Sequence, residues 1–189
     1  MDIALIGAGG HAKIVVEILE AMGNRVVAYC DRRASSWLDA PRLEDDGLLG
    51  TLPAGIGVAL GVGGIDPAGL ARRRRLLEAA IADGRPAPAI VHPSAIIGRG
   101  ASLGPGAQVL AGAILQPGVR LGLASLVNSG ALLEHDSEIG DGSHASPRAV
   151  VLADCRVGSD CMIGTGAVIL PGNVVPDATL VPALTRFPR

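Results

Sequence analysis

A six-residue repeat fills the second half of this chain and limits the folds open to it. Cut into hexads from residue 89 to residue 184, the sequence keeps one register through sixteen consecutive units. Val, Ile or Leu stands at the third position of every hexad except the one that contains Ala145, and the first position is nearly always small. Glycine or proline recurs near the corner of each hexad, which favours tight turns. The repeat therefore indicates a repetitive architecture.

One large aliphatic residue in every six suits short β-strands joined by tight corners. The aliphatic side chains would point to a common axis, and three strands would close one triangular coil. The hexads then predict about five coils stacked about 4.8 Å apart. An α-helix is excluded, because a residue at every sixth position would move round the helix instead of keeping to one face. We therefore predict a parallel β-helix for the second half.

The first half alternates strand and helix patterns instead. Short apolar runs at 3–7, 25–31 and 57–64 predict three strands, and segments 11–23 and 66–84 predict two helices. Asp66 is the expected N-cap of the second helix, Pro67 its first residue and Gly84 its end. This alternation predicts a small Rossmann-like parallel sheet flanked by helices. We expect two domains, residues 1–88 and 89–189.

Composition and charge exclude several classes of partner. The net charge of -2 and the 2% aromatic content favour neither nucleic acid nor an anionic membrane. Cys30, Cys155 and Cys161 lack CxxC spacing and lie in apolar surroundings, so we expect buried thiols, no disulfide and a reducing compartment. The chain has no basic leader and no uncharged apolar run of about 20 residues. These features predict a soluble, cytoplasmic protein.

Two motifs narrow the class further. GAGGHAK follows the first predicted strand, and a pattern of Asn, Glu-His-Asp, Ile-Gly, His and Pro runs along the hexads from residue 128 to residue 147. With the repeat, these motifs resemble the bacterial family of nucleotide-linked 4-amino-sugar N-acetyltransferases and sialic-acid O-acetyltransferases, within the hexapeptide-repeat superfamily. The resemblance covers nearly the whole chain. It implies that the β-helix is left-handed, an exception to the right-handed crossover rule.

The same resemblance implies an activity. The expected reaction moves acetyl from acetyl-CoA to the amino group of a UDP-linked 4-amino sugar, in surface-polysaccharide or glycoprotein-sugar synthesis. Acetylation of a hydroxyl on sialic acid or a related sugar is the near alternative. Family members work as homotrimers and use no metal, and we expect the same here.

The stretch ALLEHDSEIGDGSHASP holds the predicted catalytic group. By resemblance, His135 is the general base that takes a proton from the sugar amine or hydroxyl, because an imidazole with a pKa near 6.5 suits such work. Either Asp136 or Glu134 would orient the ring and stabilise the imidazolium. The alternative for His135 is a polar corner residue bonded to a neighbouring coil.

Further residues match the acetyl-CoA contacts of the family. His144 matches a second histidine near the thioester, although Ser143 and Pro147 beside it also suit an ordinary turn. It lies nine residues after His135, half a coil away, so the two rings could meet only across a subunit boundary. Ala145 interrupts the aliphatic ladder beside this proposed site. Three small or polar residues of later coils match other acetyl-CoA contacts, with corner geometry as their alternative: Gly164, Thr165 and Ala183.

The glycine-rich segment GAGGHAK is the predicted binding site of the nucleotide. It lacks the GxGxxG spacing of a dinucleotide site, and the family uses it for the sugar nucleotide. By resemblance the substrate contacts are Gly9, Gly10, His11, Asp31 and Gly61, at the carboxyl ends of parallel strands. Residues 72–75 form a run of four arginines, which we interpret as a solvated helix face because four consecutive positions point to all sides.

Two other classes compete with this interpretation. A hexapeptide-repeat carbonic anhydrase needs three histidine ligands for zinc, and this chain has four histidines. His11 lies outside the predicted β-helix, and His92, a predicted turn residue, is more than two coils from His135. Only His135 and His144 could then serve. A non-catalytic trimeric scaffold would keep its function when His135 is replaced by alanine.

Overall fold

The computed structural model describes residues 1–188, without the side chains of residues 46 and 48. Its N-terminal elements alternate in the way that the sequence predicts. They are β1 (Asp2–Ile6), α1 (Gly10–Ala21), β2 (Arg25–Cys30), β3 (Arg42–Leu43), the 3-10 helix η1 (Asp46–Thr51), β4 (Gly57–Leu60) and α2 (Pro67–Ala82). The strands form a parallel sheet in the order β3-β2-β1-β4. The pattern did not predict β3 or η1, which are short and carry no clear periodicity.

Helices cover both faces of this sheet. Ile3 and Leu5 of β1 pack in one apolar cluster with α1, while Ala4 and Ile6 pack in another with Leu77 of α2. The second helix begins as predicted, because Asp66 Oδ1 accepts the backbone N–H of Gly69 at 2.7 Å and Pro67 follows at the first position. It ends just before Gly84, whose φ is +79°.

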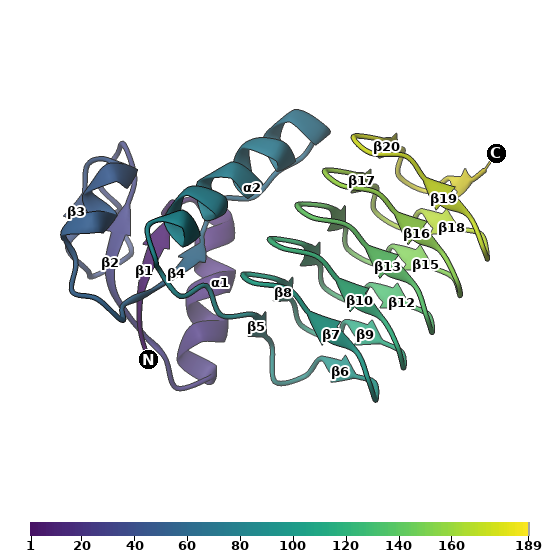
Figure 1. Cartoon of the computed structure of the whole chain (residues 1–189), viewed down its shortest axis with the longest axis horizontal. Helices are drawn as coiled ribbons and strands as arrows, with labels where there is room; N and C mark the ends of the chain where they lie inside the picture. Colours follow the sequence, from purple (N-terminus) through teal and green to yellow (C-terminus); the bar gives the residue numbers. More distant parts are fainter. Residues whose placement is uncertain (189) are drawn as a thin grey trace.

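The second half is a parallel β-solenoid of two-residue strands in three sheets (Figure 1). Sheet 1 holds β5 (Ile90–Val91), β8 (Gln108–Val109), β11 (Leu126–Val127), β14 (His144–Ala145), β17 (Met162–Ile163) and β20 (Leu180–Val181). Sheet 2 holds β6 (Ile96–Ile97), β9 (Ile114–Leu115), β12 (Leu132–Leu133), β15 (Val150–Val151), β18 (Val168–Ile169) and β21 (Arg186–Phe187). Sheet 3 holds β7 (Ser102–Leu103), β10 (Arg120–Leu121), β13 (Glu138–Ile139), β16 (Arg156–Val157) and β19 (Val174–Val175).

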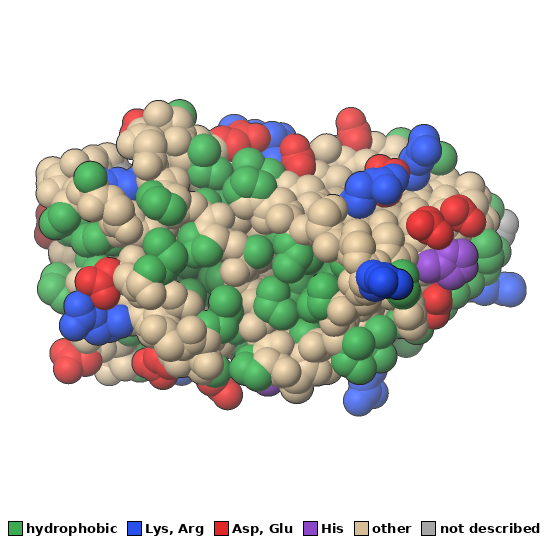
Figure 2. All heavy atoms as spheres, turned by 60° about the horizontal axis from the view of Figure 1, so that its bottom comes forward, with side chains coloured by type: hydrophobic (Ala, Val, Ile, Leu, Met, Phe, Trp, Pro, Cys, Tyr) green, Lys and Arg blue, Asp and Glu red, His purple; other side chains and the backbone are tan. Residues whose placement is uncertain are grey.

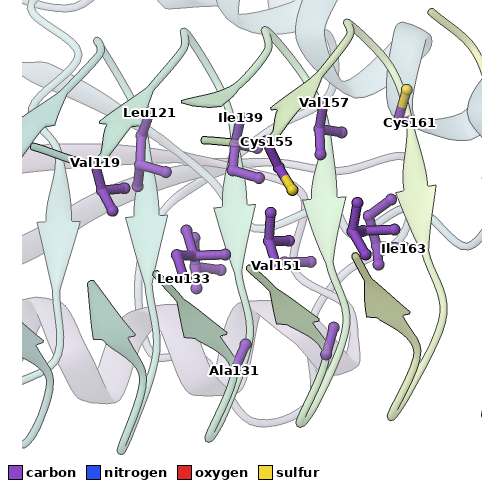
Figure 3. Packing of buried hydrophobic residues seen from close by; sticks show 14 of the residues in the cluster. Val119, Leu121, Ala131, Leu133, Ile139, Val151, Cys155, Val157, Cys161 and Ile163 are labelled. Carbon is purple, nitrogen blue, oxygen red and sulfur yellow. The ribbon is translucent and has the colours of Figure 1, made fainter. Parts of the chain in front are cut away.

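The predicted register is confirmed strand by strand. Leu126 pairs with His144 and Leu132 with Val150, so each coil advances by 18 residues and returns to the same sheet. The third residue of each hexad points inward, and Figure 3 shows Leu121, Leu133 and Ile139 stacked in this interior. The first, small residue of the hexad also faces inward. This packing explains both positions of the repeat.

The last residue of each hexad explains the corners. This residue has a left-handed backbone conformation in nearly every hexad. It is a glycine in some hexads, such as Gly106 and Gly130, and an aspartate in others, namely Asp136, Asp154 and Asp160. Glycine adopts this conformation without a steric penalty, and aspartate tolerates it better than most residues. Fixed corners of this kind hold exposed side chains at regular intervals along the solenoid.

The N-terminal domain packs directly against sheet 1 (Figure 1). Ile90, Leu110 and Leu126 of the solenoid belong to the same buried cluster as α1. Ala124 lies in the cluster that contains Leu77 of α2. The two halves therefore share a continuous core, although the boundary at residues 88 and 89 stays a prediction.

The arginine run corrects a prediction from the sequence. Arg72 and Arg75 are exposed as predicted, but Arg73 is 1% exposed and Arg74 is half-buried, so the run is not solvated throughout. The reason is the docking of α2 on the solenoid, which places Leu70, Arg73 and Leu77 on the inner side of the helix. Their spacing of three and four residues is that of one helix face.

Arg74 provides a testable link between the two halves. Its guanidinium donates to both carboxylate oxygens of Asp160, at 2.9 and 2.8 Å, and to Glu78. We expect Asp160→Asn to lower the free energy of unfolding by about 1 to 3 kcal/mol, because it removes a charge-assisted bidentate contact but keeps the left-handed corner. Chemical denaturation measures this change. Asp154→Asn is the matched control. An equal loss of stability in that variant would contradict a specific contribution of the Arg74–Asp160 contact.

No helix in the described part of the chain is long and apolar enough to cross a membrane. Cys30, Cys155 and Cys161 are all buried and form no disulfide. Cytoplasmic location stays a prediction.

Candidate active site

His135 stands on an exposed corner between β12 and β13. The structure places its Nδ1 2.9 Å from Asp136 Oδ2. The carboxylate can only accept when ionised, so Nδ1 carries the hydrogen and Nε2 is left to take a proton. The ring is 55% exposed and therefore accessible to a reactant.

Asp136, and not Glu134, contacts the imidazole. The hydrogen bond that His135 donates to Asp136 is the main cause that raises the pKa of His135 above its ordinary value, and the charges of Asp154 and Glu134 act in the same direction. The position of the Asp136 carboxylate also depends on the preceding coil, because a Cβ at Gly118 would overlap Asp136 Oδ1. The chain thus provides space for the aspartate at this corner.

A cavity of about 370 Å³ lies in the N-terminal domain, at the carboxyl ends of the parallel strands. All five residues expected at the binding site of the nucleotide line it. Its lining is Gly9, Gly10, His11, Asp31, Gly61, Val62, Gly63, Gly69, Arg72, Arg73 and Leu76. The two arginines give this cavity a positive side that our sequence interpretation missed.

Asp31 fixes the glycine-rich loop at the edge of the cavity. Its carboxylate accepts the backbone N–H groups of Ala8 and Arg33 at 2.9 and 3.0 Å, and these bonds lower its pKa. Trp37 donates from Nε1 to the carbonyl of Ala8 at 3.0 Å. The loop is therefore held from both sides, and the sequence pattern gave no signal for Trp37.

The glycines of the cavity have different structural reasons. A Cβ at Gly61 would overlap the carbonyl oxygen of Gly7, so the close approach of two chain segments requires glycine there. A Cβ at Gly9 or Gly10 would meet nothing within 4 Å. These two residues leave open space at the start of α1, where backbone N–H groups can face an anion.

His144 lies on β14 of sheet 1, beneath the N-terminal domain. Its Nδ1 is 3.3 Å from the carbonyl of Gly64, which only accepts, so Nε2 accepts from the amide nitrogen of Asn128 at 3.0 Å. Burial lowers the pKa of His144 to about 4, which keeps the ring neutral. Both nitrogens thus have protein partners, and the expected acetyl-CoA contact stays a prediction.

The other three residues expected near acetyl-CoA lie together on successive coils. Thr165 and Ala183 are exposed, and Gly164 lies directly beneath the backbone of Ala183. A Cβ at Gly164 would overlap the Ala183 nitrogen, so stacking alone accounts for this glycine. Their contact with acetyl-CoA stays a prediction.

One chain keeps His135 and His144 apart. His144 faces the N-terminal domain from sheet 1, near His11, whose charge would lower the pKa of His144. His135 occupies the corner that joins sheet 2 to sheet 3 and does not line the cavity. No group of three His, Cys, Asp or Glu side chains that could hold a metal occurs among residues 1–188.

Comparisons with known proteins match this architecture. The family model of the PglD N-terminal domain matches residues 2–65, and that of the bacterial transferase hexapeptide (six repeats) matches residues 136–171. The acetyltransferase domain of PglB from Neisseria gonorrhoeae is 30% identical, with a TM-score of 0.89 over 98% of this chain and 90% of that one. This chain belongs to the bacterial sugar acetyltransferase family of the hexapeptide-repeat superfamily. It is therefore an acyltransferase, and its solenoid is a left-handed parallel β-helix.

Other solved structures resemble the enzyme over most of its length. PerB from Caulobacter crescentus, solved with CoA and GDP-perosamine, is 26% identical with a TM-score of 0.78, covering 97% of this chain and 95% of that one. WeeI from Acinetobacter baumannii shares the fold at 20% identity and a TM-score of 0.75, covering 98% of this chain and 96% of that one. No curated protein matches the chain.

Proposed function

We propose that this enzyme transfers the acetyl group of acetyl-CoA to the amino group of a nucleotide-linked 4-amino sugar, with UDP as the expected nucleotide. The observation that carries the proposal is the His135–Asp136 pair on an accessible corner of the β-helix. The relatives support the reaction class, because PerB was solved with CoA and GDP-perosamine and PglB with acetyl coenzyme A.

His135 is the general base in this proposal. Nε2 takes a proton from the attacking sugar amine as its nitrogen forms a bond to the thioester carbonyl carbon. The carbon–sulfur bond then breaks, and the CoA thiolate leaves as a thiol by taking the proton from the His135 imidazolium, which regenerates the neutral base. Asp136 orients the ring through Nδ1 and stabilises the imidazolium that forms.

The N-terminal cavity is the proposed site of the sugar nucleotide. Its volume falls in the range of small-molecule sites, and its lining combines open glycines with Arg72. Backbone N–H groups at the start of α1 and the nearby guanidinium groups would face the diphosphate. Asp31 is the proposed contact for the nucleobase of the sugar nucleotide.

The outer face of sheet 2 supports a homotrimer whose sites form between subunits. Its outward row is aliphatic, whereas sheet 3 presents the ion pairs of Arg120 and Arg156 with Glu138 and sheet 1 is covered by the N-terminal domain. Members of the aliphatic row are Ile96, Ile114, Leu132, Val150 and Val168. Figure 2 shows that hydrophobic side chains also reach the surface across the middle of one face of the molecule. Burying such a row against a second copy is favourable.

A thiol-release assay tests the proposed function. Purified enzyme is given acetyl-CoA with UDP-, GDP- and dTDP-linked 4-amino sugars and with sialic acid, and His135→Ala is run in parallel. We expect His135-dependent release with a nucleotide-linked amino sugar, and the fastest turnover with UDP. Release with sialic acid alone would favour O-acetylation, and the absence of His135-dependent release with every sugar would refute the catalytic assignment.

The pH dependence of kcat/KM provides a test of Asp136. Because Asp136 raises the pKa of His135, the neutral base is lost as pH falls through that raised pKa. We expect Asp136→Asn to lower this pKa, so that the acidic limb of the profile moves to lower pH while the maximum rate falls. Glu134→Gln is the matched control and should move the limb less. A larger shift in the Glu134 variant would identify Glu134 as the orienting acid.

A further inference from the structure

Gln108 is a buried polar residue at the junction of the two halves. It occupies the second, outward position of its hexad on β8, in the same row as Ile90 and Leu126. The row packs under the N-terminal domain, and Gln108 is fully buried. A buried amide in an apolar row is costly unless all its polar atoms are bonded.

Two hydrogen bonds fix the orientation of the Gln108 amide. Nε2 lies 2.8 Å from the carbonyl of Leu60, at the end of β4, and a carbonyl can only accept. Oε1 lies 3.0 Å from Arg73 Nη2, and a guanidinium can only donate. Both partners therefore require the same assignment of oxygen and nitrogen, which removes the usual ambiguity of an amide.

This orientation determines the protonation of His11. Its Nε2 lies 2.8 Å from Gln108 Oε1, and since that oxygen accepts, Nε2 must carry a hydrogen. Burial is the main cause that lowers the pKa of His11, and the charge of Arg73 acts in the same direction, so the ring is neutral near pH 7. A neutral imidazole with hydrogen on Nε2 has a bare acceptor at Nδ1.

The bare nitrogen is available to a ligand. His11 lines the cavity beside Gly9 and Gly10, and Nδ1 has no hydrogen-bond partner within residues 1–188. Gly63 lies beside His11 in the same cavity, and a Cβ there would make ordinary van der Waals contact with the His11 Cβ at 3.6 Å. The cavity thus contains a hydrogen-bond acceptor, His11 Nδ1, whose protonation state is determined by Gln108 of the β-helix.

We propose that Gln108 is a positioning residue that holds His11 as a neutral hydrogen-bond acceptor, so that the cavity selects a ligand with an N–H or O–H group facing Nδ1. This inference deepens the proposed function, on which its ligand part rests, by assigning a sugar hydroxyl or amine as the group recognised there. Arg73 supports the arrangement, because its guanidinium also donates to the carbonyls of Val62 and Ala124.

Nuclear magnetic resonance of the full chain with ¹⁵N-labelled histidine tests the protonation directly. We expect the long-range ¹H–¹⁵N pattern of His11 to show hydrogen on Nε2 alone near neutral pH. Its resonances are assigned by their loss in His11→Asn. A ring with hydrogen on Nδ1, or a doubly protonated ring, would overturn the proposal whether or not a substrate is known.

Gln108→Glu tests the consequence for binding. A carboxylate at this position stabilises the charged imidazolium, so Nδ1 becomes a donor and the ligand contact is lost. We expect the KM for the sugar nucleotide to rise about tenfold or more, with the KM for acetyl-CoA and kcat nearly unchanged. Gln116→Glu is the matched control, because Gln116 is a half-buried corner residue of the β-helix that does not line the cavity. An unchanged KM in folded Gln108→Glu would contradict the positioning role.

A second pair of variants covers the case in which Gln108→Glu does not fold. Asn at residue 11 keeps an acceptor near the position of Nδ1, and Leu does not. We expect the KM for the sugar nucleotide to be lower in His11→Asn than in His11→Leu. Equal KM values would overturn the assigned contact. If no sugar nucleotide is turned over although the predicted hydrogen is found on Nε2, the proposed function and the ligand assignment fail, while the effect of Gln108 on the ring stands.

Discussion

Replacement of His135 by alanine is expected to lower kcat by about 100- to 10,000-fold, the range typical of a lost general base. The KM for either substrate should change much less, because the ring acts on the proton and does not fill the nucleotide cavity. Steady-state kinetics with acetyl-CoA and the accepted sugar measures both parameters. The fold should be preserved, since His135 is exposed and its only side-chain hydrogen bond among the described residues is to Asp136.

His92→Ala is the matched control for this variant. His92 is a turn residue of the first coil, where Nδ1 contacts the hydroxyl and backbone N–H of Ser94 at 2.8 and 3.0 Å. We expect it to keep nearly full kcat. An active His135→Ala protein would exclude His135 as the base and favour a different catalytic group.

Val150→Lys is expected to dissociate the proposed trimer and to reduce activity by at least about 100-fold, because a buried unpaired ammonium is costly and the proposed site needs two chains. Val150 lies in the middle of the aliphatic row of sheet 2. Analytical ultracentrifugation at matched concentrations gives the oligomeric state, and the thiol-release assay gives the activity.

Val174→Lys is the control on sheet 3, where Val174 is exposed. It should leave both the oligomer and the activity intact. Dissociation by this variant, with Val150→Lys still trimeric, would place the interface on sheet 3 instead.

Mixed trimers test the sharing of a site between subunits. His135→Ala lacks the base and His11→Leu lacks a contact in the cavity, so each should be weakly active alone when the sugar nucleotide is kept well below its KM. If the protein is a trimer in which base and cavity come from different chains, refolding the two variants together in equal amounts restores about a quarter of the sites of the unmodified protein. No gain in activity would show that one chain supplies both.

Much of the fold follows from the sequence because its causes are local or strictly periodic. One inward aliphatic and one small inward residue in each hexad determine the coils, and Leu133 and Ile139 keep this pattern through the candidate site. The ends of α2 follow from the side chain of Asp66 and the conformation of Gly84. These signals act within a few residues, so a single sequence contains them.

The residues missed by the sequence analysis depend on contacts between distant segments. Arg73 belongs to a charged run, and only the docking of α2 on the solenoid buries it. Gln108 contacts His11 across 97 residues. Its one local signal is a polar residue in an outward row whose neighbours, Ile90 and Leu126, are aliphatic. This break in the pattern of outward-facing residues is the signal that identifies Gln108.

The chemical form of the product tests the central claim most directly. The enzyme is incubated with acetyl-CoA and a UDP-linked 4-amino sugar, and the sugar nucleotide is analysed by mass spectrometry before and after treatment with hydroxylamine, which cleaves esters but not amides. We predict a product that carries one additional acetyl group, resists hydroxylamine and is not formed by His135→Ala. An acetylated product that hydroxylamine cleaves, or an amide formed equally well by His135→Ala, would contradict the account.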